Sequence, residues 1–212
     1  YLEKCGHQTA WLRFNSGDKV TLKYKLANLL LKRKDRNRSY KHQNVDGFQL
    51  FENKFLCETK QEYNSFAQLK KNPPQADAYI TGSDQVCAGL SPERYLVFAP
   101  KGTKKISYAA SFGSPKTGLL NKILFTWRLK GMDYISVRER AGVDYCKTFG
   151  RGDAVCVCDP SLLLYKSDYE AFLQKGRVVK QPYIFSYWVN PINSLEDISW
   201  KHIINYAESN NM

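Results

Sequence analysis

Residues 77–86 read DAYITGSDQV, a short apolar stretch that runs directly into a Gly-Ser turn. Residues 104–113, KKISYAASFG, repeat that arrangement. Residues 133–139, DYISVRE, and 154–159, AVCVCD, follow with the same change from apolar to polar. Strands that alternate with helical segments are typical of βαβ units. The sequence therefore predicts an α/β domain with a Rossmann-like, largely parallel sheet flanked by helices.

Apolar residues at helical spacing predict helices around these strands. The clearest faces are Leu22, Leu26, Leu29 and Leu30, and then Leu120, Ile123, Leu124 and Trp127. Near the start of the chain, Gly6 is typical of a helix end, and residues 8–14 predict a short strand. A short helix around residues 63–67 is expected to stop before Pro73, which cannot continue it.

The composition is that of an ordinary globular protein, with 43% hydrophobic and 25% charged residues among 212. No uncharged apolar run reaches the ~18 residues of a membrane span. The formal net charge of +12 favours anionic partners such as nucleic acid, a membrane surface or phosphorylated small molecules. The six cysteines lack zinc-ligand spacing, so we expect free buried thiols and no metal site.

A change of pattern at Gln181-Pro182 predicts a domain boundary. Residues 183–189 predict a strand and the residues around 195–203 a helix, which together are typical of the opening of an α/β domain. We assign residues 1–180 to a Rossmann-like N-terminal domain and residues 181–212 to the start of a second α/β domain. Since the chain begins inside an expected helical turn, we expect a fragment of a longer protein that lacks the first strand.

Polar motifs stand at three strand ends, where open parallel sheets bind ligands. They are residues 82–85 (GSDQ), 111–113 (SFG) and 138–140 (RER). A Gly-Ser turn can present backbone N–H groups to an anion. Asp84 can accept a proton from a hydroxyl, and Arg138 offers a planar fork for carboxylate or phosphate. These groups suit a reaction that joins an anionic donor to a sugar-like acceptor.

Each of these features also has an ordinary structural explanation. Asp84 could cap a helix, and Arg138 could pair with Glu139 or with a helix end. Residues 111–113 could form only a tight turn. Residues 159–160, Asp-Pro, are more typical of the start of a turn than of a catalytic acid.

Taken together, residues 77–86, 104–113, 135–139 and 159–164 (DPSLLL) resemble the polysaccharide pyruvyl transferase family in order and spacing. The resemblance extends more weakly to both ends of the chain, and residues 32–57 match least. Four ordered motifs are far more specific than any single one.

The resemblance implies a two-domain fold similar to GT-B glycosyltransferases, with the active site between the domains. It implies phosphoenolpyruvate as co-substrate, no bound cofactor, and formation of a pyruvate ketal on two hydroxyls of a sugar. The acceptor would belong to a polysaccharide or to its lipid-linked precursor. The resemblance further implies a bacterial, cytoplasmic enzyme of exopolysaccharide or cell-envelope biosynthesis, in peripheral contact with the inner face of the membrane.

The same resemblance assigns roles to residues. Asp84 and Arg138 are the catalytic candidates: Asp84 acts on or orients the acceptor hydroxyl, and Arg138 binds the donor. The residues expected to line the substrate site are Gly82, Ser83, Gln85, Ser111, Phe112, Gly113 and Glu139. Cys87 stands where the family often has Trp, which would change acceptor choice. Because a second domain would complete the cleft, we expect the 212-residue chain to be inactive alone.

Two other functions remain open. A glycosyltransferase with a nucleotide-sugar donor would use a similar fold and cleft. A basic module for nucleic acid or membrane would rest on the net charge and on residues 32–38, KRKDRNR, a run that is more typical of a solvated face. Since no recognised nucleic-acid motif is present, we predict no nucleic-acid partner.

Overall fold

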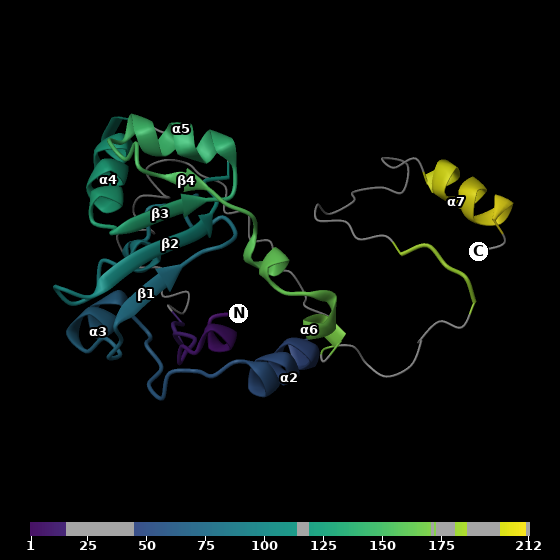
Figure 1. Ribbon diagram of the computed structural model, residues 1–212, viewed down its shortest axis with the longest axis horizontal. Helices are drawn as coiled ribbons and strands as arrows, with labels where there is room; N and C mark the ends of the chain where they lie inside the picture. Colours follow the sequence, from purple (N-terminus) through teal and green to yellow (C-terminus); the bar gives the residue numbers. More distant parts are fainter. Residues whose placement is uncertain (16–44, 114–118, 171, 173–180, 186–199, 211–212) are drawn as a thin grey trace, which may run out of the picture. The chain divides into compact units, whose positions relative to one another are not determined.

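The computed structural model describes residues 1–15, 45–113, 119–170, 172, 181–185 and 200–210 (Figure 1). They divide into two compact units, Tyr1–Leu164 and Tyr165–Met212. The predicted helix over residues 22–30 and the basic run at 32–38 lie outside the described residues. The predicted boundary after residue 180 adjoins residues that are not described, so it stays a prediction.

The first unit contains, among its described residues, a four-stranded sheet in the order β1-β2-β3-β4 (Figure 1). The strands are β1 (Ala78–Thr81), β2 (Lys104–Ala110), β3 (Tyr134–Val137) and β4 (Val155–Cys156). Every neighbouring pair is parallel. This confirms the predicted α/β class with a parallel sheet, although β4 is shorter than the expected residues 154–157.

Helices precede and separate the strands of this unit. They are α2 (Val45–Phe55), α3 (Phe66–Lys71), α4 (Leu119–Lys130) and α5 (Arg140–Thr148), with 3-10 turns η1 (Glu3–Cys5), η2 (Pro92–Tyr95) and η3 (Pro160–Leu163). The Ser65 side chain accepts a hydrogen bond from the Gln68 N–H at the start of α3, and α3 ends before Pro73 as predicted. Gly6 ends η1 with φ +86°, which confirms the predicted helix stop.

The segment before α3 differs from the prediction. Residues 8–14 form no continuous strand; Trp11 makes an isolated parallel bridge with Glu58, and Phe14 makes one with Tyr63. Tyr63 therefore lies outside the helix that it was expected to begin, and its side chain is fully buried. The tertiary contact of an aromatic residue outweighs the helical spacing here.

The core beside the sheet is built mainly from aromatic residues of α4, α5 and the segments that follow β2 and α5. Phe125 of α4 stacks on Phe149 with ring centroids 5.4 Å apart, and Phe112 stacks on Tyr145 at 5.8 Å. Leu129 of α4 is also buried on this side. These contacts fix α4 and α5 around the end of β2.

The predicted apolar face of α4 is not its buried face. Ile123, Leu124 and Trp127 share one side of the helix as expected, but all three are exposed; the side chain of Leu120, the fourth residue of the predicted face, lies outside the described part. The core takes Phe125 and Leu129 instead, at i and i+4. An apolar repeat at helical spacing therefore identified the helix but not the side that packs.

All six cysteines are free thiols, as predicted, yet only Cys87 and Cys146 are buried. Burial raises the pKa of Cys87 to about 12 and the pKa of Cys146 to about 11. Both thiols therefore stay protonated at neutral pH and act as small apolar core residues.

The second unit contributes α6 (Lys166–Glu170) and α7 (Trp200–Ser209). Helix α7 confirms part of the helix predicted around residues 195–203. Residues 183–185 carry no strand, and the rest of the strand predicted over 183–189 lies outside the described residues. Within the part of the chain that the structure describes, no helix has the length and apolarity needed to cross a bilayer.

Candidate active site

The carboxyl ends of the strands bring the three predicted polar motifs to one edge of the sheet. The pairing of Thr81 with Ser107, and of Ala110 with Val137, puts the residues that follow β1, β2 and β3 side by side. The Arg138 N–H donates to the Ala110 carbonyl at 3.2 Å and carries this alignment past the end of β3. The parallel topology therefore places these motifs where ligands bind in open sheets.

Hydrogen bonds join the loops after β1 and β2. The Ser111 N–H donates to the Asp84 carbonyl at 2.8 Å, and the Cys87 N–H donates to the Ser111 carbonyl at 3.1 Å. The Ser111 hydroxyl accepts from the Gly113 N–H at 3.1 Å. A Cβ on Gly113 would lie 3.2 Å from the Gln85 side chain, so the two loops also pack closely. The buried Ser111 thus fixes the position of the loop that carries Asp84 through these hydrogen bonds.

Gly82 allows the loop after β1 to lie directly against β2. Its φ is +127°, and a Cβ there would lie only 1.9 Å from the Tyr108 carbonyl oxygen. No residue with a side chain fits this backbone conformation and this contact. Glycine is therefore required at the end of β1 for a steric reason, because any Cβ would overlap the Tyr108 carbonyl.

Arg138 lies at the centre of a cluster of three carboxylates. Its Nη1 is 3.0 Å from Asp159 Oδ2, its Nε is 3.3 Å from Glu139 Oε1, and its Nη2 is 3.9 Å from Asp84 Oδ1. The hydrogen bonds to Asp159 and Glu139 raise the pKa of Arg138 further above its usual value. The guanidinium therefore keeps its charge, and its Nη2 edge faces Asp84 without a hydrogen bond among the described residues.

Asp159 is the member of this cluster that sequence reasoning missed. As the N-cap of η3, its Oδ1 accepts the Ser161 N–H at 3.0 Å. That backbone bond, followed by the Ser161 side chain, Arg138 and Ser83, lowers the pKa of Asp159 to about 2. The Asp-Pro-Ser pattern signals this cap, and the predicted turn start is confirmed, but the pattern says nothing about the partner across the sheet.

The structure also separates the candidate residues by how they are exposed. The Asp84 side chain is 89% exposed. The alternative explanation from the sequence, that Asp84 caps a helix, is wrong for the described part of the chain, because no helix begins there. The Phe112 side chain is buried in the aromatic core, so only its backbone can reach a ligand. The predicted pairing of Arg138 with Glu139 is present alongside the new pairing with Asp159.

Backbone donors lie beside the charged cluster. The N–H groups of Ser83, Asp84 and Gln85 donate to no acceptor within the described residues. Asp84 has φ +36°, a left-handed conformation that is typical of loops presenting consecutive N–H groups. Together with the Nη2 edge of Arg138, these groups can bind oxygen atoms of a ligand, and the Asp84 carboxylate can accept a proton from a hydroxyl. No group of residues suited to a metal ion occurs in the described ranges.

An α/β fold with charged residues at the carboxyl edge of parallel strands defines a ligand-binding domain of the kind found in many enzymes. The family model for polysaccharide pyruvyl transferase matches residues 9–210. The chain therefore belongs to the polysaccharide pyruvyl transferase family, a family of transferases in polysaccharide biosynthesis. No curated protein and no solved structure matches the sequence.

Proposed function

We propose that this protein transfers the pyruvyl group of phosphoenolpyruvate to a sugar of a polysaccharide, or of its lipid-linked precursor, and forms a pyruvate ketal. Family membership is the observation that carries the proposal. Two sugar hydroxyls each form a bond to C2 of the donor, while the bond from C2 to the phosphate oxygen breaks and the double bond between C2 and the methylene carbon becomes single. Of the two hydroxyl protons, one ends on the donor methylene carbon, which becomes a methyl group, and the other on the released phosphate.

Asp84 is proposed to act on the acceptor. Its carboxylate is exposed at the carboxyl edge of the sheet, where it can accept the proton of a sugar hydroxyl or orient that hydroxyl. The loop that carries Asp84 is held by the buried Ser111, which supports a fixed position for the carboxylate. The neighbouring Gly82, Ser83 and Gln85 belong to the same proposed acceptor site.

Arg138 is proposed to bind the donor through its Nη2 edge, because Nε and Nη1 already bond to Glu139 and Asp159. A guanidinium suits both the carboxylate and the phosphate of phosphoenolpyruvate. Three carboxylates surround this one cation, so further cationic groups are needed to bind a donor that is itself an anion. We therefore retain the proposal of a GT-B-like arrangement in which a second domain supplies them.

The proposal also places the reaction in the cytoplasm of a bacterium, in exopolysaccharide or cell-envelope biosynthesis. A lipid-linked acceptor would lie at the inner face of the membrane. The net charge of +12 supports peripheral contact with anionic lipid there.

The test is phosphate release from phosphoenolpyruvate by the full-length protein in the presence of a saccharide acceptor. Asp84→Asn and Arg138→Ala should each lower turnover at least tenfold, or about 1.4 kcal/mol. Asp144→Asn, which removes an exposed carboxylate from α5, is the matched control and should keep full activity. Full activity in both site variants would refute the assigned roles. Thermal stabilisation by nucleotide-sugars, with none by phosphoenolpyruvate, would instead favour a glycosyltransferase.

A further inference from the structure

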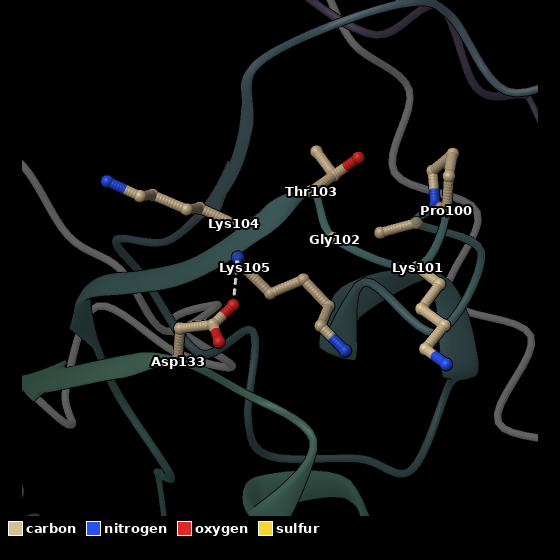
Figure 2. Close-up of a pocket in the computed structure, with 8 residues that line it drawn as sticks. Pro100, Lys101, Gly102, Thr103, Lys104, Lys105 and Asp133 are labelled. Carbon is tan, nitrogen blue, oxygen red and sulfur yellow. Dashed lines mark hydrogen bonds between the residues drawn. The ribbon is translucent and has the colours of Figure 1, made fainter.

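A pocket lies at the amino edge of the sheet, opposite the candidate active site. It has a volume of about 370 Å³ and lies between the turn before β2 and the residue before β3 (Figure 2). Its lining includes Lys101, Gly102, Thr103, Lys104, Lys105 and Asp133. Since β2 is 7 residues long, the pocket lies roughly 20 Å from the carboxyl edge at about 3.3 Å per residue. It is therefore separate from the Arg138 cluster.

The lysines of this pocket do not all point the same way. Figure 2 shows the ammonium groups of Lys101 and Lys105 extending to the same side of the turn, whereas Lys104 extends away from them. None of the three forms an ion pair with a carboxylate in the described part of the chain. The nearest acid, Asp133, already accepts the Lys105 backbone N–H at 2.7 Å. Three lysines against the one carboxylate of Asp133 therefore leave the pocket lining with an excess of positive charge.

The local backbone favours this arrangement. The Thr103 N–H donates to the Pro100 carbonyl at 3.2 Å and closes a turn in which Gly102 has φ +90°. The Gly102 N–H donates to no acceptor among the residues that the structure describes. A Cβ on Gly131 would lie 3.9 Å from Lys105 Nζ, which places that ammonium group beside the end of α4.

The helix dipole does not account for both lysines. Lysines at the C-terminal end of a helix are commonly explained by that dipole, and Lys105 lies beside the end of α4. Lys101 is in a turn that belongs to no helix, and yet its ammonium group extends to the same side as that of Lys105 (Figure 2). Two ammonium groups on one side of a turn, with a backbone N–H in that turn that is free among the described residues, offer the donors that an anion site needs.

We propose that Lys101, Lys105 and the Gly102 turn bind a phosphate-bearing anion. A phosphate has the charge to pair with two ammonium groups and the oxygen atoms to accept the backbone N–H. The phosphate could belong to a soluble phosphorylated compound or to a lipid headgroup. The proposal does not depend on the transferase function, because it concerns the opposite edge of the sheet.

The test compares single charge removals at this edge in the full-length protein. Titration calorimetry with pyrophosphate at low salt measures binding, and an Arg138→Ala background excludes a contribution from the candidate active site. Lys101→Gln and Lys105→Gln should each weaken binding about fivefold or more. Lys104→Gln removes the same charge from the first residue of β2, whose side chain extends away from the other two, and Lys122→Gln removes one from the first half of α4; both should change affinity less than twofold.

Equal losses in the Lys101, Lys104 and Lys105 variants would mean a diffuse electrostatic field and would overturn the proposal. Absence of saturable binding, both to pyrophosphate and to vesicles, would also overturn it. Since Lys105 is half-buried, thermal unfolding is used to check that Lys105→Gln is folded. If Lys105→Gln does not fold, the effect of Lys101→Gln on pyrophosphate binding decides the proposal.

The source of the phosphate is resolved by sedimentation with vesicles of phosphatidylcholine, with and without phosphatidylglycerol. Vesicle binding that Lys101→Gln reduces and Lys104→Gln preserves supports a lipid headgroup. Pyrophosphate binding without vesicle binding supports a soluble phosphate compound. If Lys101→Gln and Lys104→Gln reduce vesicle binding equally, the lipid does not bind specifically at the Lys101–Lys105 pocket, which would contradict the proposal.

Discussion

The contact between Asp159 and Arg138 gives a prediction whose size can be worked out. Asp159→Asn keeps the shape of the side chain and removes its charge. The new amide oxygen can accept the Ser161 N–H, but the NH₂ group then faces Arg138 Nη1, which is also a donor. The guanidinium thus loses its shortest carboxylate contact, and the free energy of unfolding should fall.

The expected loss follows from the pKa of Asp159. Folding lowers this pKa from 3.8 to about 2, mainly through the Ser161 N–H and further through Arg138. A shift of that size corresponds to about 2 kcal/mol at neutral pH. Because the Asp159 side chain is 29% exposed and that of Arg138 is 32% exposed, solvent screens the interaction, and we expect about 1 kcal/mol.

The pH dependence provides the assay. Between about pH 4 and pH 2 the unfolded chain binds the Asp159 proton more readily than the folded one. The contribution is therefore complete above about pH 4, about half lost at pH 3 and almost absent near pH 2. Urea unfolding of the wild type and of Asp159→Asn at pH 7, 5 and 3 should show a difference that follows this course.

Asp144→Asn is the matched control for these measurements, since Asp144 is exposed on α5 and makes no ion pair in the described ranges. It should leave the free energy of unfolding unchanged at all three pH values. If Asp159→Asn shows no loss at pH 7, or the same loss at pH 3, the carboxylate does not hold Arg138 as the structure has it.

Two further substitutions test the backbone around the sheet. Gly82→Ala should destabilise the domain by about 3 kcal/mol or more, because the new Cβ would overlap the Tyr108 carbonyl at a positive φ; Gly89→Ala meets nothing within 4 Å, and equal stabilities of the two variants in urea would contradict this geometry. Arg151→Met should cost about 3 kcal/mol in thermal unfolding, because the buried guanidinium donates to three backbone carbonyls between α4 and β3 and pairs with Asp153. Arg151→Lys restores the charge without the planar set of donors and should recover less than half of that loss. If Arg151→Met unfolds at the same temperature as the wild type, Arg151 does not stabilise the domain through these hydrogen bonds.

Local signals in the sequence predicted the framework of the fold well. Gly6 and Pro73 end their helices because each has a backbone property that no other residue type shares. The strands β1, β2 and β3 form in the apolar parts of the stretches at residues 77–86, 104–113 and 133–139, as predicted. Their polar continuations meet at one edge because parallel pairing leaves no other arrangement, so the place of the candidate site could also be predicted.

Contacts between distant segments could not be predicted in this way. The side of α4 that packs is chosen by the aromatic rings of Phe112 and Phe149, which the spacing within α4 cannot show. The pairing of Asp159 with Arg138 joins residues 21 positions apart. Both depend on how two strands or helices lie against each other, and a single sequence contains that information only indirectly.

The distribution of charge decides how the proposed chemistry can work. A net charge of +12 predicts an anionic ligand, but in the Arg138 cluster of the candidate active site one guanidinium faces three carboxylates. Since the pKa of Asp159 is held at about 2, protonation does not relieve this excess at neutral pH. Phosphoenolpyruvate can therefore bind at this edge only if additional cationic groups face it, and the described lysines of the amino edge lie too far away to do so. Unchanged affinity for phosphoenolpyruvate in Arg138→Ala would mean that those other groups bind the donor alone, and that Arg138 serves to organise the carboxylates around the acceptor.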